Sequence, residues 1–311
     1  MEKIKIICVL GPTASGKTGL GISLAKLYNG EIVSADSMQI YTGAHIASAA
    51  ADKEEMCGIK HHLLEFLPFD APFTVYDYLE KARAVIADIN SRGKLPIIVG
   101  GTGLYINALL DGIRLSPETA QSELRSELEA EYENKGGEYM LSALSKVDPR
   151  QAEKLSPNDK RRIVRALEIY KSTGKTKTEL DILSKPATGD YDYIALGITA
   201  SDRENLYNRI NTRVDMMMEK GLLEEARKAF MLKTDRTNGI TQAIGHKEFF
   251  PYFEGEITLS EAVENLKRQT RRYAKRQLTW FNKRKDIKWL YFDTCDVLKE
   301  AKAILESEGK P

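Results

Sequence analysis

The stretch that most limits the possible folds is GPTASGKT, which occupies residues 11–18. It follows an apolar run, Ile4–Leu10, and precedes a helical pattern over Gly19–Tyr28. A loop of the form G-x-x-x-x-G-K-S/T between a strand and a helix holds a phosphate, because its N–H groups face the anion. Lys17 adds a positive charge, and Thr18 can bind Mg²⁺. The predicted phosphate-binding residues are Gly11, Pro12, Thr13, Ala14, Ser15, Gly16, Lys17 and Thr18. The loop alone leaves the ligand open between ATP and another diphosphate.

Short apolar runs alternate with helical patterns through the first 111 residues, which is typical of a parallel sheet covered by helices. Further strands are expected at Glu31–Ala35 and Leu95–Val99, with a helix at Val75–Asn90 between them. On the helix after the loop, Leu20, Leu24 and Leu27 share one face.

Strand patterns stop at about residue 111 and resume at Tyr191–Ile198, and the stretch between them is charged and helical. We therefore predict an α/β fold, a P-loop NTPase-like parallel sheet flanked by helices. Its catalytic core would comprise residues 1–111 and 190–311, and residues 112–189 would form a helical insertion domain.

The C-terminal part of the core is expected to begin with a long helix that ends near Lys220. Ser201 is its predicted N-cap, with Glu204 completing a capping box. Its apolar residues Leu206, Ile210, Val214 and Met217 face one way. A basic helix over Leu259–Arg284 and a last strand at Ile287–Phe292 follow.

Two polar residues, Asp36 and Thr102, follow the second and third predicted strands. Parallel strands end at the same edge of a sheet, so we expect these residues and Lys17 to converge on one crevice. From the residues alone, Asp36 could cap a turn, hold Mg²⁺ or take part in catalysis. The strand Leu95–Val99 ends in GGTG without an acid, which disfavours an ATPase.

A run of ten basic residues and one acid lies between Lys267 and Lys288, in a chain with 46 basic and 45 acidic residues overall. Four of them recur at helical spacing, namely Arg268, Arg272, Lys275 and Arg276, and Tyr273, Trp280 and Phe281 are interleaved. This density predicts contact with nucleic acid rather than a merely solvated face. A second cluster, Lys160, Arg161, Arg162 and Arg165, makes a larger polyanion the expected partner.

The remaining composition predicts a cytoplasmic protein without a membrane segment. Three scattered cysteines form no disulfide framework, and no apolar run approaches the roughly 18 residues of a spanning helix. His61 and His62 are interpreted as structural, and His45 and His246 are given no role.

Eight ordered motifs, which together span about residues 4–293, carry a family resemblance. They are GPTASGKT, SADSMQIY, HHLLEF, PIIVGGTGLYI, DKRRIVRALEIY, DRENLYNRINTRVDMMMEKGLLEE, QAIGHKEF and RRYAKRQLTWF. On these motifs the chain resembles the tRNA dimethylallyltransferases, also called tRNA isopentenyltransferases, of the bacterial type. That family transfers a dimethylallyl group from dimethylallyl diphosphate to N6 of the adenosine 3′-adjacent to the anticodon.

The resemblance implies that the loop holds a prenyl diphosphate with Mg²⁺ rather than ATP. It makes Asp36 the general base, which typically contributes about 10²–10⁴ in rate. Lys17, Thr102 and Arg213 are the other implied catalytic residues, and Thr18 the implied metal ligand. The implied tRNA-binding residues are Asp36, Ser37, Met38, Gln39, Thr102, Arg125, Lys160, Arg161, Arg162, Ile163, Val164, Arg268, Arg272 and Arg276. The anticodon stem-loop would be bound by a monomer.

The chain departs from the family pattern in two places. HIASAAADK at residues 45–53 replaces a stretch similar to Asp-Ile-Gly-Thr-Ala-Lys-Pro, and His246 stands where tyrosine is common. Three alternatives remain open: a small-molecule kinase, a prenyltransferase for free adenine nucleotides, and a tRNA binder without catalysis. The basic helix and the insertion argue against the first two, and retention of Lys17, Thr18, Asp36 and Thr102 argues against the third.

Overall fold

The computed structural model describes residues 3–69, 71–115, 122–186, 188–232 and 239–309. The chain divides into two compact units. Unit 1 comprises Met1–Leu110 and Asp190–Pro311, and unit 2 comprises Asp111–Gly189. Each unit has its own hydrophobic core and is described by itself.

Unit 1 is built on a six-stranded sheet in the order β3-β2-β4-β1-β5-β6, in which every neighbouring pair is parallel. The strands are β1 (Ile4–Leu10), β2 (Gly30–Ser34), β3 (His61–His62), β4 (Leu95–Gly100), β5 (Tyr191–Thr199) and β6 (Ile287–Tyr291). The predicted α/β fold with a parallel sheet is confirmed. Among the described strands, β3 was the one that the sequence did not predict, because its two residues, His61 and His62, are too few to show a periodic pattern.

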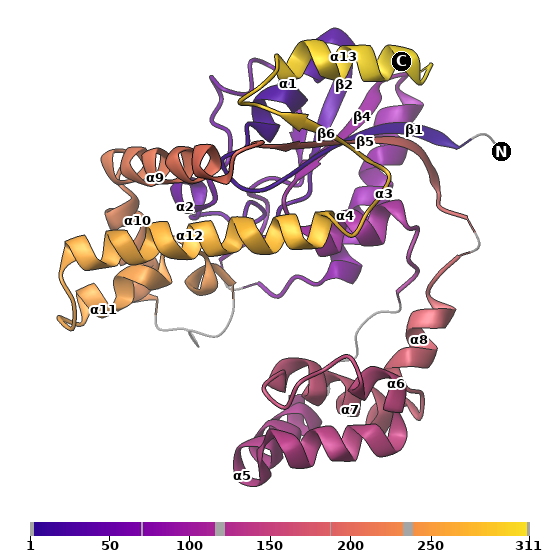
Figure 1. The fold of residues 1–311 in the computed structure, drawn as a ribbon, viewed down its shortest axis with the longest axis vertical. Helices are drawn as coiled ribbons and strands as arrows, with labels where there is room; N and C mark the ends of the chain where they lie inside the picture. Colours follow the sequence, from indigo (N-terminus) through magenta and orange to yellow (C-terminus); the bar gives the residue numbers. More distant parts are fainter. Residues whose placement is uncertain (1–2, 70, 116–121, 187, 233–238, 310–311) are drawn as a thin grey trace. The chain divides into compact units, whose positions relative to one another are not determined.

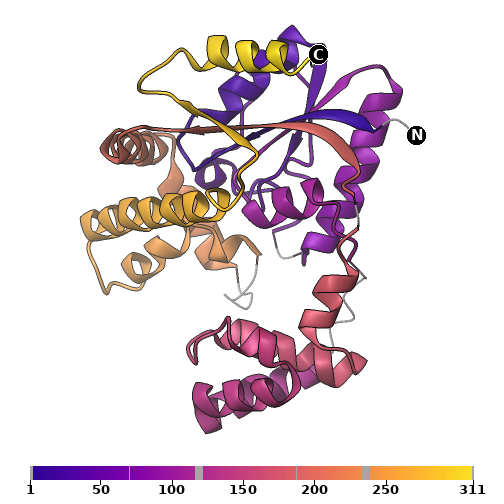
Figure 2. The same ribbon diagram turned by 45° about the vertical axis from the view of Figure 1, so that its right-hand side comes forward.

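Helices cover both faces of the sheet, so its central strands are buried on both sides (Figures 1 and 2). α1 (Lys17–Leu27) and α13 (Val297–Ser307) lie on one face, and α3 (Val75–Ser91) and α4 (Gly103–Leu110) lie on the other. Leu20 and Leu24 are buried as expected, but Leu27 is 50% exposed because α1 ends there.

The remaining elements of unit 1 surround the carboxyl edge of the sheet. They are α2 (His45–Ser48), α9 (Arg203–Glu219), α10 (Leu222–Met231), two short 3₁₀ turns, η1 (Gly239–Gln242) and η2 (Lys247–Phe249), α11 (Phe250–Phe253) and α12 (Leu259–Phe281). The predicted capping box of α9 is wrong. Asp202 is the N-cap and accepts from the Glu204 N–H at 3.0 Å, whereas Ser201 bonds to the Asp293 carboxylate.

The regular secondary structure of the described part of unit 2 is entirely helical. It consists of α5 (Ser122–Val147), α6 (Pro149–Ala152), α7 (Lys160–Thr173) and α8 (Lys177–Leu183). α5 is interrupted at Gly136, whose φ of 80° and ψ of 164° are not helical. None of the described helices of either unit is long and apolar enough to span a membrane.

Candidate active site

The GPTASGKT loop turns from β1 into α1 through two glycines. A Cβ on Gly11 would lie 2.2 Å from the Ile198 carbonyl oxygen, so no side chain fits where the loop passes β5. Gly16 precedes α1 with a φ of 94°, in the left-handed region that favours glycine. The loop and the first turn of α1 thus form the anion-binding shape that the sequence predicts.

The Lys17 side chain bends back over this loop, and its ammonium donates to the Pro12 carbonyl at 2.7 Å. Burial, together with the nearby Arg213 charge, lowers the Lys17 pKa to about 8, and Asp36 partly opposes this shift. A bound diphosphate would supply the negative charge that the buried ammonium lacks.

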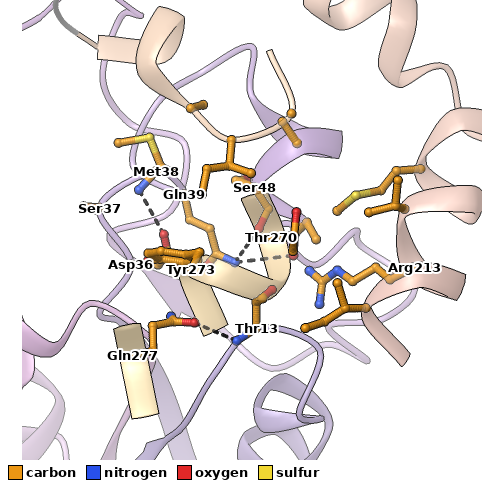
Figure 3. A pocket seen from close by; sticks show the side chains of 18 of the residues that line it. Thr13, Asp36, Ser37, Met38, Gln39, Ser48, Arg213, Thr270, Tyr273 and Gln277 are labelled. Carbon is orange, nitrogen blue, oxygen red and sulfur yellow. Dashed lines mark hydrogen bonds between the residues drawn. The ribbon is translucent and has the colours of Figure 1, made fainter. Parts of the chain in front are cut away.

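A cavity of about 300 Å³ opens beside the loop and brings together segments that are far apart in the sequence (Figure 3). Four cationic residues line it, Lys17, Arg213, Lys247 and Arg276, against the single acid Asp36. Aliphatic side chains also line it, and they are Ile210, Val214, Met217, Ile244 and Leu266. The cavity therefore suits a ligand with an anionic end and an apolar end.

Asp36 lies in this cavity directly after β2. One of its carboxylate oxygens accepts from the Met38 N–H at 2.9 Å, which fixes the turn that carries Ser37 to Gln39 (Figure 3). Asp36 therefore caps a turn, as one interpretation of the sequence held, and also faces the cavity, so the two roles are compatible.

Thr102 lies one layer behind the cavity wall rather than among the lining residues. Its hydroxyl accepts from the Ser37 N–H at 2.9 Å and is hydrogen-bonded to Tyr273. Burial and the Asp36 charge raise the Tyr273 pKa, so the phenol stays protonated. Thr102 thus supports the segment that presents Asp36 from behind.

Gln277 of α12 forms hydrogen bonds to both the GPTASGKT loop and the GGTG turn that follows β4. This residue was not identified from the sequence. Its side-chain oxygen accepts from the Thr13 N–H, and its amide donates to the Gly101 carbonyl, both at 2.9 Å. A Cβ on Gly101 would lie 2.3 Å from the Gln277 amide nitrogen, which explains the glycine there. Leu266, Thr270 and Tyr273 line the cavity from the same face. Uncharged residues at helical spacing inside a basic run are the signal that could have revealed this inward face.

The basic run from Lys267 to Lys288 extends beyond the end of α12 at Phe281, and several of its cations are bonded to other side chains. Lys267 pairs with Asp215, Arg271 bonds to Asn211, Arg284 pairs with Asp286 and Lys288 with Glu308. Arg268, Arg272, Lys275 and Arg276 are exposed, and Arg276 also reaches the cavity. The interleaved aromatics point inward instead of outward: Phe281 is buried, Trp280 packs on Gly103 and Tyr273 lines the cavity.

In unit 2 the expected tRNA contacts also separate into two groups. Arg161 and Arg162 are exposed at the start of α7, and Lys160 lies over the Tyr132 ring. Arg125 is 43% exposed on α5, beside Glu129. The side chains of Ile163 and Val164, by contrast, are buried in the core of unit 2. α7 turns its apolar face inward, and the expected contact of these two residues with tRNA stays a prediction.

Each of the four histidines contacts a polar group of the fold; the sequence predicts a structural role for His61 and His62 alone. His62 bonds to the buried Glu31 carboxylate at 2.7 Å, and the His61 ring bonds to the Ile59 carbonyl. His45 contacts Glu65 at the surface, and His246 is wholly buried. Among the described residues, no cluster of three or more histidine, cysteine or acidic side chains is arranged to hold a metal ion.

The fold and cavity together define a P-loop α/β protein whose cavity is lined by four cationic residues. Comparison with known proteins narrows this class. A family model described as IPP transferase matches residues 39–284, and one described as isopentenyl transferase matches residues 4–69.

Relatives and solved structures agree with the family models. The tRNA dimethylallyltransferase of Acetivibrio thermocellus is 45% identical over 308 residues, covering 98% of each chain. That of Halalkalibacterium halodurans is 44% identical and covers 95% of this chain and 93% of its own. A crystal structure of a tRNA isopentenylpyrophosphate transferase from Bacillus halodurans aligns with a TM-score of 0.72 at 41% identity, covering 99% of this chain and 96% of that one. A eukaryotic dimethylallyltransferase, described as acting on tRNA, aligns with a TM-score of 0.84 at 31% identity, covering 99% of this chain and 80% of that one.

The chain belongs to the tRNA dimethylallyltransferase family, and it is a transferase of the prenyltransferase class.

Proposed function

We propose that the protein transfers a dimethylallyl group from dimethylallyl diphosphate to N6 of the adenosine 3′-adjacent to the anticodon in tRNA. The observation that carries the proposal is the composition of the cavity wall. The wall contains four cationic side chains and several aliphatic side chains, and a single carboxylate among its lining residues faces the same space. A diphosphate joined to a short branched alkyl chain matches both kinds of side chain at once.

The chemistry assigns a task to each end of the cavity. The adenine N6 attacks the first carbon of the allyl group, the carbon–oxygen bond breaks, and diphosphate leaves with the bonding electrons. N6 must lose a proton as the new bond forms, and Asp36, which lines the cavity, is proposed to accept it as general base. Lys17 and Arg213 face the negative charge that grows on the leaving diphosphate.

Arg213 supports this assignment by its surroundings. The guanidinium forms no hydrogen bond with a described residue, and burial lowers its pKa although Asp36 and Glu55 act in the opposite direction. A buried cation of this kind is stabilised when an anion arrives. Three of the aliphatic residues of the cavity wall, Ile210, Val214 and Met217, come from the same helix, α9.

Mg²⁺ fits the same end of the cavity. Thr18 lines it next to Lys17 and offers a hydroxyl oxygen, the hard donor that Mg²⁺ prefers. Mg²⁺ is usually shared between one or two protein oxygens and substrate phosphates, so a dedicated cage is not required. When bound, the ion would neutralise charge on the leaving diphosphate.

The tRNA contacts extend the proposal to the protein surface. The target base is stacked in the anticodon arm, and turning it into the cavity costs a few kcal/mol. The exposed arginines of α12, with Lys160, Arg161 and Arg162 of unit 2, are proposed to bind the phosphate backbone and offset that cost. The enzyme is proposed to work as a monomer.

The test is a transfer assay with unmodified tRNA, dimethylallyl diphosphate and Mg²⁺, read by mass spectrometry of the digested tRNA. We expect N6-dimethylallyladenosine at the position 3′ of the anticodon. Asp36→Asn should lower turnover by about 10²-fold or more and leave tRNA affinity unchanged. Asp296→Asn, which retains the N-cap of α13, is the matched control. Unmodified tRNA accompanied by ATP consumption would refute the proposal.

A further inference from the structure

The segment His45–Ala49 lines the cavity although its sequence departs from the family pattern. Ala47, Ser48 and Ala49 face the cavity, and Ile46 and Ala47 pack with the aliphatic residues of α9 and α12. A Cβ on Gly245 would lie 3.0 Å from the Ala47 Cβ, so the chain packs closely on this segment. The position of the segment therefore shapes the apolar part of the cavity.

One carboxylate holds the start of this segment. Glu225 of α10 accepts from the Ile46 N–H at 2.8 Å on one oxygen and from the Ala47 N–H at 2.9 Å on the other. These amides belong to the first turn of α2, where no helical carbonyl can accept from them. Burial raises the Glu225 pKa, but its hydrogen bonds from His246, Ile46 and Ala47 outweigh burial and leave the pKa below its ordinary value. Glu225 is therefore a carboxylate.

His246 lies directly behind Glu225 and is wholly buried. Its Nε2 is 2.9 Å from the Glu225 carboxylate, and its Nδ1 is 3.0 Å from the Ile240 carbonyl oxygen. Neither neighbour can donate a hydrogen bond, so both bonds form only when the ring carries both protons. On the same turn, the Glu248 carboxylate accepts from the Gly245 N–H, and burial raises its pKa.

We propose that Glu225 and His246 are positioning residues that hold His45–Ala49 against the prenyl tail of the donor. This inference rests on the proposed function. The two departures from the family pattern, at residues 45–53 and at His246, then meet in one network through Glu225. Removing the imidazole would leave a buried carboxylate without its partner, and such a change is strongly unfavourable. The segment would shift and the apolar wall would open.

The experiment compares two ligands, inorganic pyrophosphate and dimethylallyl diphosphate, each titrated with Mg²⁺ in a calorimeter. Their affinity ratio reports what the alkyl tail adds. In Glu225→Gln and His246→Phe we expect that ratio to fall by about fivefold or more, equivalent to about 1 kcal/mol, while pyrophosphate affinity stays unchanged. His45→Gln is the matched control, because His45 lies on the same helix but faces Glu65 at the surface.

The possible outcomes distinguish failure of the positioning role of Glu225 and His246 from failure of the proposed prenyl transfer. If wild type binds both ligands equally, the proposed function fails and the inference with it. If wild type prefers the prenyl ligand and both variants keep that preference, only the inference fails.

Hydrogen exchange on wild-type protein tests the network without any substitution that could impair folding. The Ile46 and Ala47 amides should exchange at least about tenfold more slowly than those of the exposed Lys53 and Glu54, because each is bonded to a carboxylate that is only 12% exposed. Equal exchange rates would overturn the proposed anchor.

Discussion

Replacing Gln277 with leucine removes both hydrogen bonds that tie α12 to the two glycine loops. The change keeps the approximate volume and leaves the Gly101 carbonyl and the Thr13 N–H without their partner. Gly101 is buried, and an unpaired buried carbonyl costs about 1–3 kcal/mol. Thr13 lines the cavity, where water can replace the lost oxygen, so its share is smaller, about 0.5–1 kcal/mol.

We therefore expect Gln277→Leu to lower the free energy of unfolding by about 1.5–4 kcal/mol, measured by urea denaturation. The Thr13 amide belongs to the phosphate-binding loop, so pyrophosphate affinity should also fall, by about threefold to tenfold, in calorimetry. Gly101→Ala should cause a similar loss, because its Cβ would displace the Gln277 amide from 2.3 Å away.

Gln269→Leu is the control for both measurements. Gln269 lies on the same helix, and its long 3.4 Å bond to Asn265 stays within α12. It should change stability by less than about 0.5 kcal/mol. Gln277→Leu could also stay within that limit and bind pyrophosphate like wild type. In that case the two hydrogen bonds of Gln277 have no energetic role, and the reasoning is wrong.

Three further changes test other parts of the molecule. Arg272→Ala should weaken tRNA binding and reduce the slope of log K against log salt by about 1, whereas Lys288→Ala, already paired with Glu308, should not; equal slopes would mean that α12 is merely solvated. Glu31→Gln should destabilise the fold by about 2 kcal/mol, because the buried carboxylate accepts from Arg92, Lys94 and His62. Its lowered pKa means that the difference from wild type is complete above the ordinary glutamate pKa of about 4.3 and shrinks as pH falls below it; a pH-independent gap in urea titrations would contradict this. The affinity for dimethylallyl diphosphate should fall as pH rises above about 8, where Lys17 loses its charge. Lys17→Met should remove that pH dependence. A wild-type profile as flat as that of Lys17→Met would show that the lysine charge does not hold the diphosphate.

Much of unit 1 follows from patterns that are local in the sequence. Ile4–Leu10, Leu95–Val99 and Tyr191–Ile198 are apolar runs of strand length next to glycine turns or helical patterns, and they all became strands of one parallel sheet. The position of Asp36 after β2 also follows, because parallel strands end at one edge.

Sequence-based predictions failed where two residues in a row are both good helix caps, and where contacts with distant residues determine which face of a helix is buried. Ser201 and Asp202 are both good N-caps, and Asp293 settled the choice by binding the Ser201 backbone and hydroxyl. The basic run predicted contact with nucleic acid, and no inward face was predicted, yet Gln277 and Tyr273 turn toward the cavity. Charge is conspicuous in a sequence, whereas the inward face of a helix depends on what packs against it.

The sequence by itself therefore determined the phosphate loop, the parallel sheet and the position of Asp36 at the edge of that sheet, because each depends on residues adjacent along the chain. Only the tertiary structure decided the apolar wall of the cavity, the two hydrogen bonds of Gln277 and the pairing of His246 with Glu225. Those features join segments separated by 21 to 264 residues, and their partners are chosen by packing and by the need to satisfy buried polar groups.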